Sequence, residues 1–78
     1  MAVWYEIMDQ GTANMVGDFA TEEEALRLVA RYVAAHGRAA VAKWALARDG
    51  ERDEDFLLVA AGEALAERAR VTDTAAAD

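Results

Sequence analysis

The chain has neither cysteine nor serine among its 78 residues, and it has one histidine and one lysine. Without cysteine it can form no disulfide, no thiolate nucleophile and no cysteine-ligated metal site. Hydroxyl nucleophiles are limited to threonines, and one of these is in a helix-capping motif. The glycines stand singly, so there is no glycine-rich phosphate-binding loop. We therefore predict a non-enzymatic protein with no catalytic residues, no metal site and no cofactor.

Basic residues are scarce relative to acidic ones. The chain has 8 lysine and arginine residues and 15 aspartate and glutamate residues, a net charge of −7. Non-specific nucleic-acid binding needs clustered cations that release counterions, so we expect no nucleic-acid partner. The charge favours solubility. Alternatively, it provides an acidic surface that meets a basic protein partner or imitates nucleic acid.

Long apolar runs are also missing. None approaches the roughly 20 residues that a membrane-spanning helix needs. Glu6 and Asp9 interrupt the apolar residues that follow Met1, and no basic segment precedes them as it does in a signal peptide. We therefore expect no membrane association and a cytoplasmic location. The abundance of alanine, and of arginine over lysine, is typical of a GC-rich bacterial genome.

The first half of the chain has the pattern of a β-hairpin followed by a helix. Segments 3–8 and 15–19 are β-rich and flank turn-forming residues 9–14, where Gly11 or Asn14 could accept a positive φ. Thr21 opens a capping box, and Gly37 stands where a helix C-cap is expected. The predicted helix, 22–36, carries one apolar stripe: Ala25, Leu28, Val29, Tyr32, Val33 and His36.

The second half leaves an alternative open. Segment 38–48 is rich in alanine, which favours a helix, but its apolar residues alternate and the turn signal Asp49-Gly50 follows. We predict a second hairpin with its loop at 49–55 and a buried strand at 56–60. A short C-terminal helix is predicted to start at residue 61 or 62 and to run through 69, with Leu65 as its main apolar anchor.

These elements together predict an α+β domain with the order ββαββα. A four-stranded antiparallel sheet carries one long amphipathic helix on one face, and a short C-terminal helix completes the fold. Residues 1–70 are predicted to form a single domain, close to the lower size for a chain without disulfides. Residues 71–78 are predicted to be a disordered tail.

Several short motifs lie at intervals along residues 4–69: Trp4-Tyr5-Glu6-Ile7, Asn14-Met15-Val16-Gly17, Phe19-Ala20-Thr21-Glu22-Glu23-Glu24-Ala25, His36-Gly37, Trp44-Ala45-Leu46-Ala47 and Ala60-Ala61-Gly62-Glu63-Ala64-Leu65. In these motifs the chain resembles a group of small, mostly uncharacterised bacterial proteins with the same hairpin-helix pattern. This resemblance implies no activity. In layout alone, the hairpin-helix half is also similar to HicB-like antitoxins.

Two groups of residues are candidates for chemistry. The acidic segment 49–55 could hold a hard cation, but an EF-hand loop starting at Asp49 would need glycine at Glu54 and glutamate at Ala60. We predict a solvated loop, and cation binding there stays open. His36 could act as a general base, but its place at a helix end favours capping of the last carbonyls.

The remaining feature is the apolar surface. The large aromatic residues lack the flanking basic residues of a nucleic-acid stacking platform, so we expect them in the core or at an interface. One sheet face is expected to be left uncovered in so small a chain. The candidate interaction surface consists of Trp4, Met8, Val16, Trp44, Asp53, Glu54 and Asp55.

Three functions follow as hypotheses. The first is a protein-interaction module that forms a homodimer through the open sheet face or the C-terminal helix. The second is an antitoxin- or adaptor-type regulator whose acidic surface binds a basic protein partner. The third is a small-ligand binder with a pocket between helix and sheet.

Overall fold

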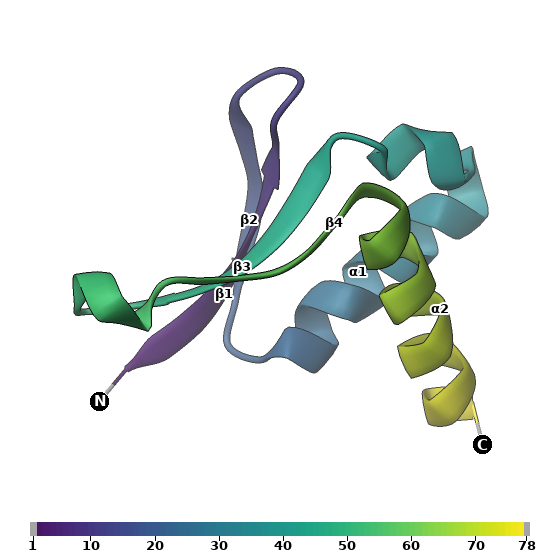
Figure 1. Cartoon of the computed structure of the whole chain (residues 1–78). Helices are drawn as coiled ribbons and strands as arrows, with labels where there is room; N and C mark the ends of the chain where they lie inside the picture. Colours follow the sequence, from purple (N-terminus) through teal and green to yellow (C-terminus); the bar gives the residue numbers. More distant parts are fainter. Residues whose placement is uncertain (1, 78) are drawn as a thin grey trace.

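The computed structural model describes residues 2–77 (Figure 1), with side-chain burial for residues 2–72. The strands and helices follow the order ββαββα, which confirms the predicted α+β class. Two 3-10 turns, η1 and η2, are added to this order. The elements are β1 (Val3–Asp9), β2 (Asn14–Phe19), α1 (Glu22–His36), η1 (Arg38–Val41), β3 (Trp44–Gly50), η2 (Asp53–Asp55), β4 (Leu57–Ala61) and α2 (Gly62–Ala77).

The four strands form one antiparallel sheet in the order β2-β1-β3-β4. β1 and β3 are therefore central, and β2 and β4 are the edges. Both helices lie on the same side of the sheet (Figure 1), where α1 packs on β1 and β2 and α2 packs on β3 and β4. Within residues 2–77 no helix covers the opposite face.

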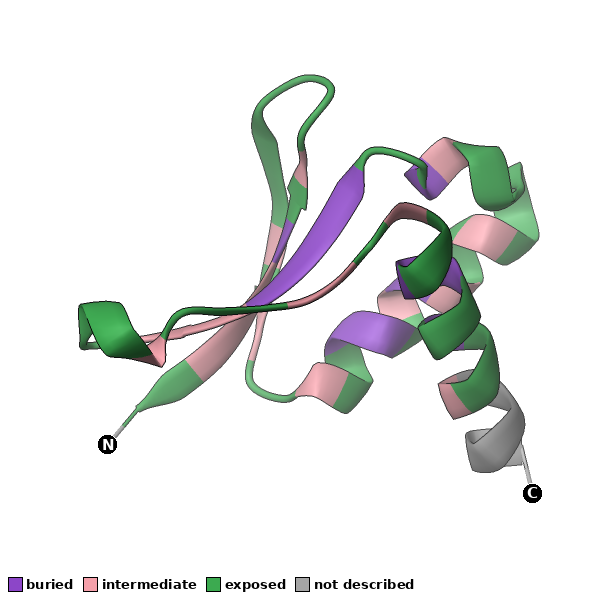
Figure 2. Ribbon diagram, in the orientation of Figure 1, coloured by how far each residue is buried: buried purple, intermediate pink, exposed green. Residues whose placement is uncertain are grey.

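The core lies between the sheet and the two helices. Ile7 and Leu46 are directly opposite each other on β1 and β3, and both are fully buried. They pack with Val29 of α1 and Leu65 of α2. Figure 2 shows the buried residues gathered where β3 faces the helices. Burying one such side chain contributes about 1.5–3 kcal/mol, so this contact holds the helices on the sheet.

Helix α1 begins and ends where its capping residues predict. The Oγ1 of Thr21 accepts a hydrogen bond of 3.1 Å from the backbone N–H of Glu24. Gly37 takes a φ of 91°, and its N–H donates to the carbonyl of Val33 at 2.7 Å. A positive φ is readily accessible to glycine, and this lets the chain leave the helix.

The buried side of α1 differs in part from the predicted stripe. Ala25 and Val29 are buried as expected, but Leu26 is also buried, whereas Tyr32 and His36 are exposed. The reason is that α1 packs against α2 as well as against the sheet. A second helix at its side therefore shifts the buried surface around the helix.

Helix α2 is longer than the short C-terminal helix predicted from the sequence. It has 16 residues, against 15 in α1, so the contrast between one long and one short helix is not confirmed. Leu65, Ala66 and Ala69 anchor it in the core. The helix also enters segment 71–78, for which a disordered tail was predicted. That disorder stays a prediction, and Asp78 lies outside the described residues.

The second hairpin is confirmed, with two corrections. In segment 38–48, a short 3-10 turn (η1) precedes the strand, which begins only at Trp44. The predicted burial of β4 is wrong, because Leu57 and Leu58 are 52% and 56% exposed. β4 is an edge strand, and only Val59 and Ala60 of its side chains pack against the core.

The turn between β1 and β2 takes its positive φ at an unexpected residue. It is Ala13, with a φ of 59°, and neither Gly11 nor Asn14. The carboxylate of Asp9 accepts a hydrogen bond from the backbone N–H of Gly11 at 2.8 Å and lies 3.4 Å from that of Thr12. These bonds fix the backbone at the start of the turn. The chain therefore reverses at Ala13, the residue before β2.

Candidate interaction surface

The sheet face opposite the helices is the candidate site. Residues paired across a β-ladder have their side chains on the same face. The register therefore identifies the residues on the side away from Ile7 and Leu46. We call the following ten residues the open face: Trp4, Glu6, Met8, Met15, Asp18, Ala45, Ala47, Asp49, Leu58 and Ala61.

The open face has an apolar part. Met8 and Met15 are directly opposite each other and are 40% and 49% exposed, and Leu58 on β4 is also exposed. On β3, between these strands, stand two small side chains, Ala45 and Ala47, which are buried among their larger neighbours. Met8 and Met15 therefore adjoin, and Leu58 stands on the same face on the far side of β3. Exposed apolar patches are typical of surfaces that a partner covers.

The open face is also acidic. Glu6 lies directly opposite Asp18, and Asp49 lies opposite Trp4. Like charges directly opposite each other on neighbouring strands are destabilising. None of the ion pairs found among the described residues includes Glu6, Asp18 or Asp49. The indole Nε1 of Trp4 donates to the carboxylate of Glu6 at 2.8 Å, which ties this ring to the acidic group.

The outer edge of the sheet at β4 is a second exposed feature. Three consecutive large apolar residues, Phe56, Leu57 and Leu58, are 52–56% exposed. Within the described chain, β4 pairs only with β3, so its other edge presents backbone N–H and carbonyl groups. Natural sheets protect such edges with charged residues, proline or bulges. Segment 56–61 has no charge or proline, although the register shifts once, at Val59.

The structure places the predicted surface residues in four different environments. Trp4 and Met8 are on the open face, and Val16 lies at the bulge of β2, where it is 36% exposed. Trp44 is not on the surface. It is 5% exposed, and its ring centroid lies 4.6 Å from that of Tyr32 on α1. Trp44 shares the face of Leu46 two positions along β3, so it points toward the helices.

The acidic residues Asp53, Glu54 and Asp55 form η2, at the end of the sheet away from the β1–β2 turn (Figure 1). The turn is held by its own contacts. The guanidinium of Arg52 pairs with Glu54 at 3.2 Å, and its backbone N–H donates to the carboxylate of Asp55 at 3.1 Å. Over the residues that the structure describes, no three metal-ligating side chains are grouped to hold an ion.

Sequence reasoning missed part of this surface. Glu6, Met15, Asp18 and Leu58 were not proposed as site residues, and Phe56 and Leu57 were expected in a buried strand. The alternation within β1 does separate Trp4, Glu6 and Met8 from the core residues. Their neighbours on the face, however, depend on strand order and register, which the alternation does not specify.

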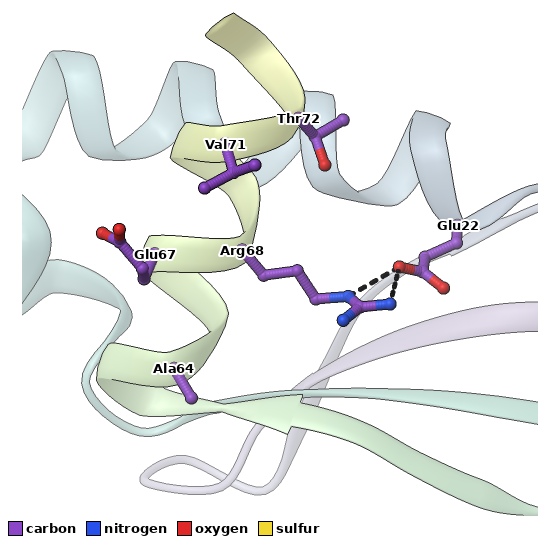
Figure 3. Close-up of a pocket in the computed structure, with 6 residues that line it drawn as sticks. All are labelled: Glu22, Ala64, Glu67, Arg68, Val71 and Thr72. Carbon is purple, nitrogen blue, oxygen red and sulfur yellow. Dashed lines mark hydrogen bonds and ion pairs between the residues drawn. The ribbon is translucent and has the colours of Figure 1, made fainter. Parts of the chain in front are cut away.

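A pocket of about 510 Å³ lies between α1 and α2, and not between helix and sheet as the third hypothesis expected (Figure 3). The guanidinium of Arg68 reaches across it to the carboxylate of Glu22 at 2.6 Å. Beside it, hydrogen bonding to Arg70 lowers the pKa of the Glu67 carboxyl. The charges at this pocket are therefore already paired, and we assign no ligand to it.

His36 lies exposed at the end of α1, with its ring centroid 4.4 Å from that of Tyr32. Tyr32 in turn packs against Trp44, so the three rings form a short row in which neighbouring rings are tilted by 45° and 40°. The imidazole therefore packs on Tyr32, and its predicted capping of the last carbonyls is not among the hydrogen bonds of the described residues.

Comparison of the chain with known protein families, curated proteins and solved structures finds no match. The resemblance to small bacterial hairpin-helix proteins and to HicB-like antitoxins therefore stays a prediction. In residues 2–77 no helix is both long and apolar enough to span a membrane. The cytoplasmic location also stays a prediction.

Proposed function

We propose that this chain is a non-enzymatic interaction module that self-associates as a two-fold dimer through the edge strand β4. The observation that carries the proposal is the exposure of Phe56, Leu57 and Leu58 on a strand edge without charged residues. An extended edge of this kind is a template for pairing with another strand. Pairing would remove both the apolar side chains and the backbone groups from water.

A second copy fits this edge for a symmetry reason. Two identical strands that pair antiparallel about a two-fold axis are self-complementary, because each residue's contact is repeated across the axis. Segment 56–61 has no charge, so this pairing brings no like charges into the ladder. Packing two open faces together would bring Glu6, Asp18 and Asp49 of both copies into one interface. We therefore favour the edge over the face for self-association.

Mass-resolved size-exclusion chromatography tests this proposal. The wild-type chain should elute at twice its mass of 8.4 kDa, and Leu57→Lys should shift it toward the monomer. The matched control is Val71→Lys, the same change at a residue that is 53% exposed on α2, which should leave the dimer unchanged. A wild-type monomer at all concentrations, or a Leu57→Lys variant that dimerises like wild type, would contradict the proposal.

A second candidate function is an adaptor- or antitoxin-type regulator with a basic protein partner. The acidic residues of the open face and the net charge of −7 favour it. Native purification followed by identification of co-eluting proteins tests this function. A stoichiometric basic protein that dissociates as salt is raised would support it, whereas a partner retained at high salt would argue against recognition by charge.

A further inference from the structure

We propose that the open face is a docking site for a basic amphipathic segment of another protein, one that presents apolar and cationic side chains on the same side. This site shares Leu58 and Ala61 with the β4 strand used for self-association, but its methionines and acidic residues lie on β1, β2 and β3. The face is apolar enough to be covered by a partner, and its charges determine which kind of partner fits.

The apolar contacts would lie at one end of the face. Met8, Met15, Ala45 and Ala61 form a single row across the four strands, and Leu58 stands in the next row. Methionine side chains are flexible and polarizable, so they adapt to partners of different shape. The two alanines of β3 are already covered by their larger neighbours, so apolar groups of the partner would contact the exposed methionines and Leu58.

The cationic contacts would follow along the strands. Glu6 and Asp18 share the row next to the methionines, and Asp49 lies one row further. Successive rows on one face are two residues apart, which is about 7 Å in a strand. A segment that places basic side chains about 7 Å and about 14 Å beyond an apolar cluster would meet both acidic rows.

The charges on the face distinguish this partner from others. Glu6 and Asp18 are held directly opposite each other, and neither forms an ion pair among the described residues. A cation placed between them would relieve their repulsion, whereas a second open face or a nucleic acid would increase it. Arg48 is on β3 but on the helix-side face, paired with Tyr5 and Leu57, and Lys43 lies against Gly11 at the β1–β2 turn.

Calorimetric titration with synthetic peptides tests the site. The probe is an amphipathic lysine–leucine peptide, and the comparison peptides have equal length but are either lysine–serine or glutamate–leucine. The lysine–leucine peptide should bind more tightly than both. Absence of binding, or equal binding of the lysine–serine peptide, would overturn the proposal, since the latter would show general attraction to an acidic protein.

Two charge variants test the position of the site. The face variant carries Glu6→Gln, Asp18→Asn and Asp49→Asn. The control removes three exposed charges elsewhere, with Glu24→Gln, Glu51→Gln and Glu63→Gln. The face variant should bind the lysine–leucine peptide about tenfold more weakly than wild type, and the control variant should bind nearly as wild type does. Equal losses in the two variants would overturn the proposal.

A third comparison separates this site from the proposed dimer. Leu57→Lys changes the edge strand on the helix-side face, because Leu57 is paired with Arg48, so peptide binding should persist in that variant. Met8→Ser combined with Met15→Ser should weaken binding without changing charge or the oligomeric state. Unchanged peptide binding in this double variant would overturn the apolar part of the site, whatever the result for the dimer.

Discussion

A single residue, Ala13, carries a backbone conformation that alanine disfavours. Its φ of 59° is in the left-handed region, which costs an L-residue roughly 1–2 kcal/mol and glycine much less. We expect Ala13→Gly to stabilise the chain by about 0.5–1 kcal/mol, measured by thermal or urea unfolding, which corresponds to a rise in Tm of about 2–8 °C. Ala34→Gly, on the exposed side of α1, should lower the stability instead. A loss of stability in Ala13→Gly would contradict the positive φ at Ala13.

The pair formed by Glu6 and Asp18 is the second feature at the residue scale. Since the two residues are directly opposite on neighbouring strands, Asp18→Lys should replace repulsion by attraction. The expected gain is about 0.2–1 kcal/mol in the free energy of unfolding, and it should shrink as salt is added. Unfolding in urea at low and high salt measures it. No gain at low salt would mean that the two side chains do not face each other.

Local chemistry explains which parts of the fold were predictable. The caps of α1 depend on Thr21 and Gly37 and on neighbours within four residues, so sequence alone placed both ends of the helix. The turn residue was missed because the Asp9 hydrogen bonds shift the reversal to Ala13. The burial of Trp44 follows from its sharing a face with Leu46. The prediction that Trp44 is on the surface is wrong because large aromatic residues are equally compatible with a core and with an interface.

At the scale of elements, the packing of α2 against the sheet can be tested through Leu65. Leu65 is fully buried between α2 and the sheet, and removing such a side chain to alanine costs about 2–5 kcal/mol. We expect Leu65→Ala to lower the free energy of unfolding by about that amount, while Val71→Ala, at an exposed site on the same helix, changes it by less than about 0.5 kcal/mol. Equal effects in urea unfolding would mean that α2 is not packed as described.

The Glu67–Arg70 pair adds a pH dependence to α2. The hydrogen bond from Arg70 lowers the pKa of the Glu67 carboxyl in the folded chain. A lowered pKa contributes stability that is fully present above the ordinary carboxyl pKa and is lost as pH falls through the lowered value. Glu67→Gln should therefore reduce the acid sensitivity of unfolding in that range and leave the slope near neutral pH unchanged. An identical acid limb in both proteins would contradict this.

The length of α2 and the exposure of β4 were both mispredicted from sequence for one reason. An apolar run such as 56–60 is compatible with a central or an edge strand, and only the order of the four strands decides between them. In the same way, continuation of α2 beyond Ala69 depends on the core contacts that anchor its first half. These are properties of the assembled sheet and helices.

At the scale of the whole molecule, over residues 2–77, two helices cover one face of a four-stranded sheet and leave the other face and one apolar edge exposed. Amide hydrogen exchange at several protein concentrations tests our central claim, that β4 is where two copies meet. We expect the outward amides of β4 to become more protected as concentration rises, while those of the other edge strand, β2, exchange rapidly throughout. β4 amides that exchange as fast as those of β2 at every concentration would contradict the claim.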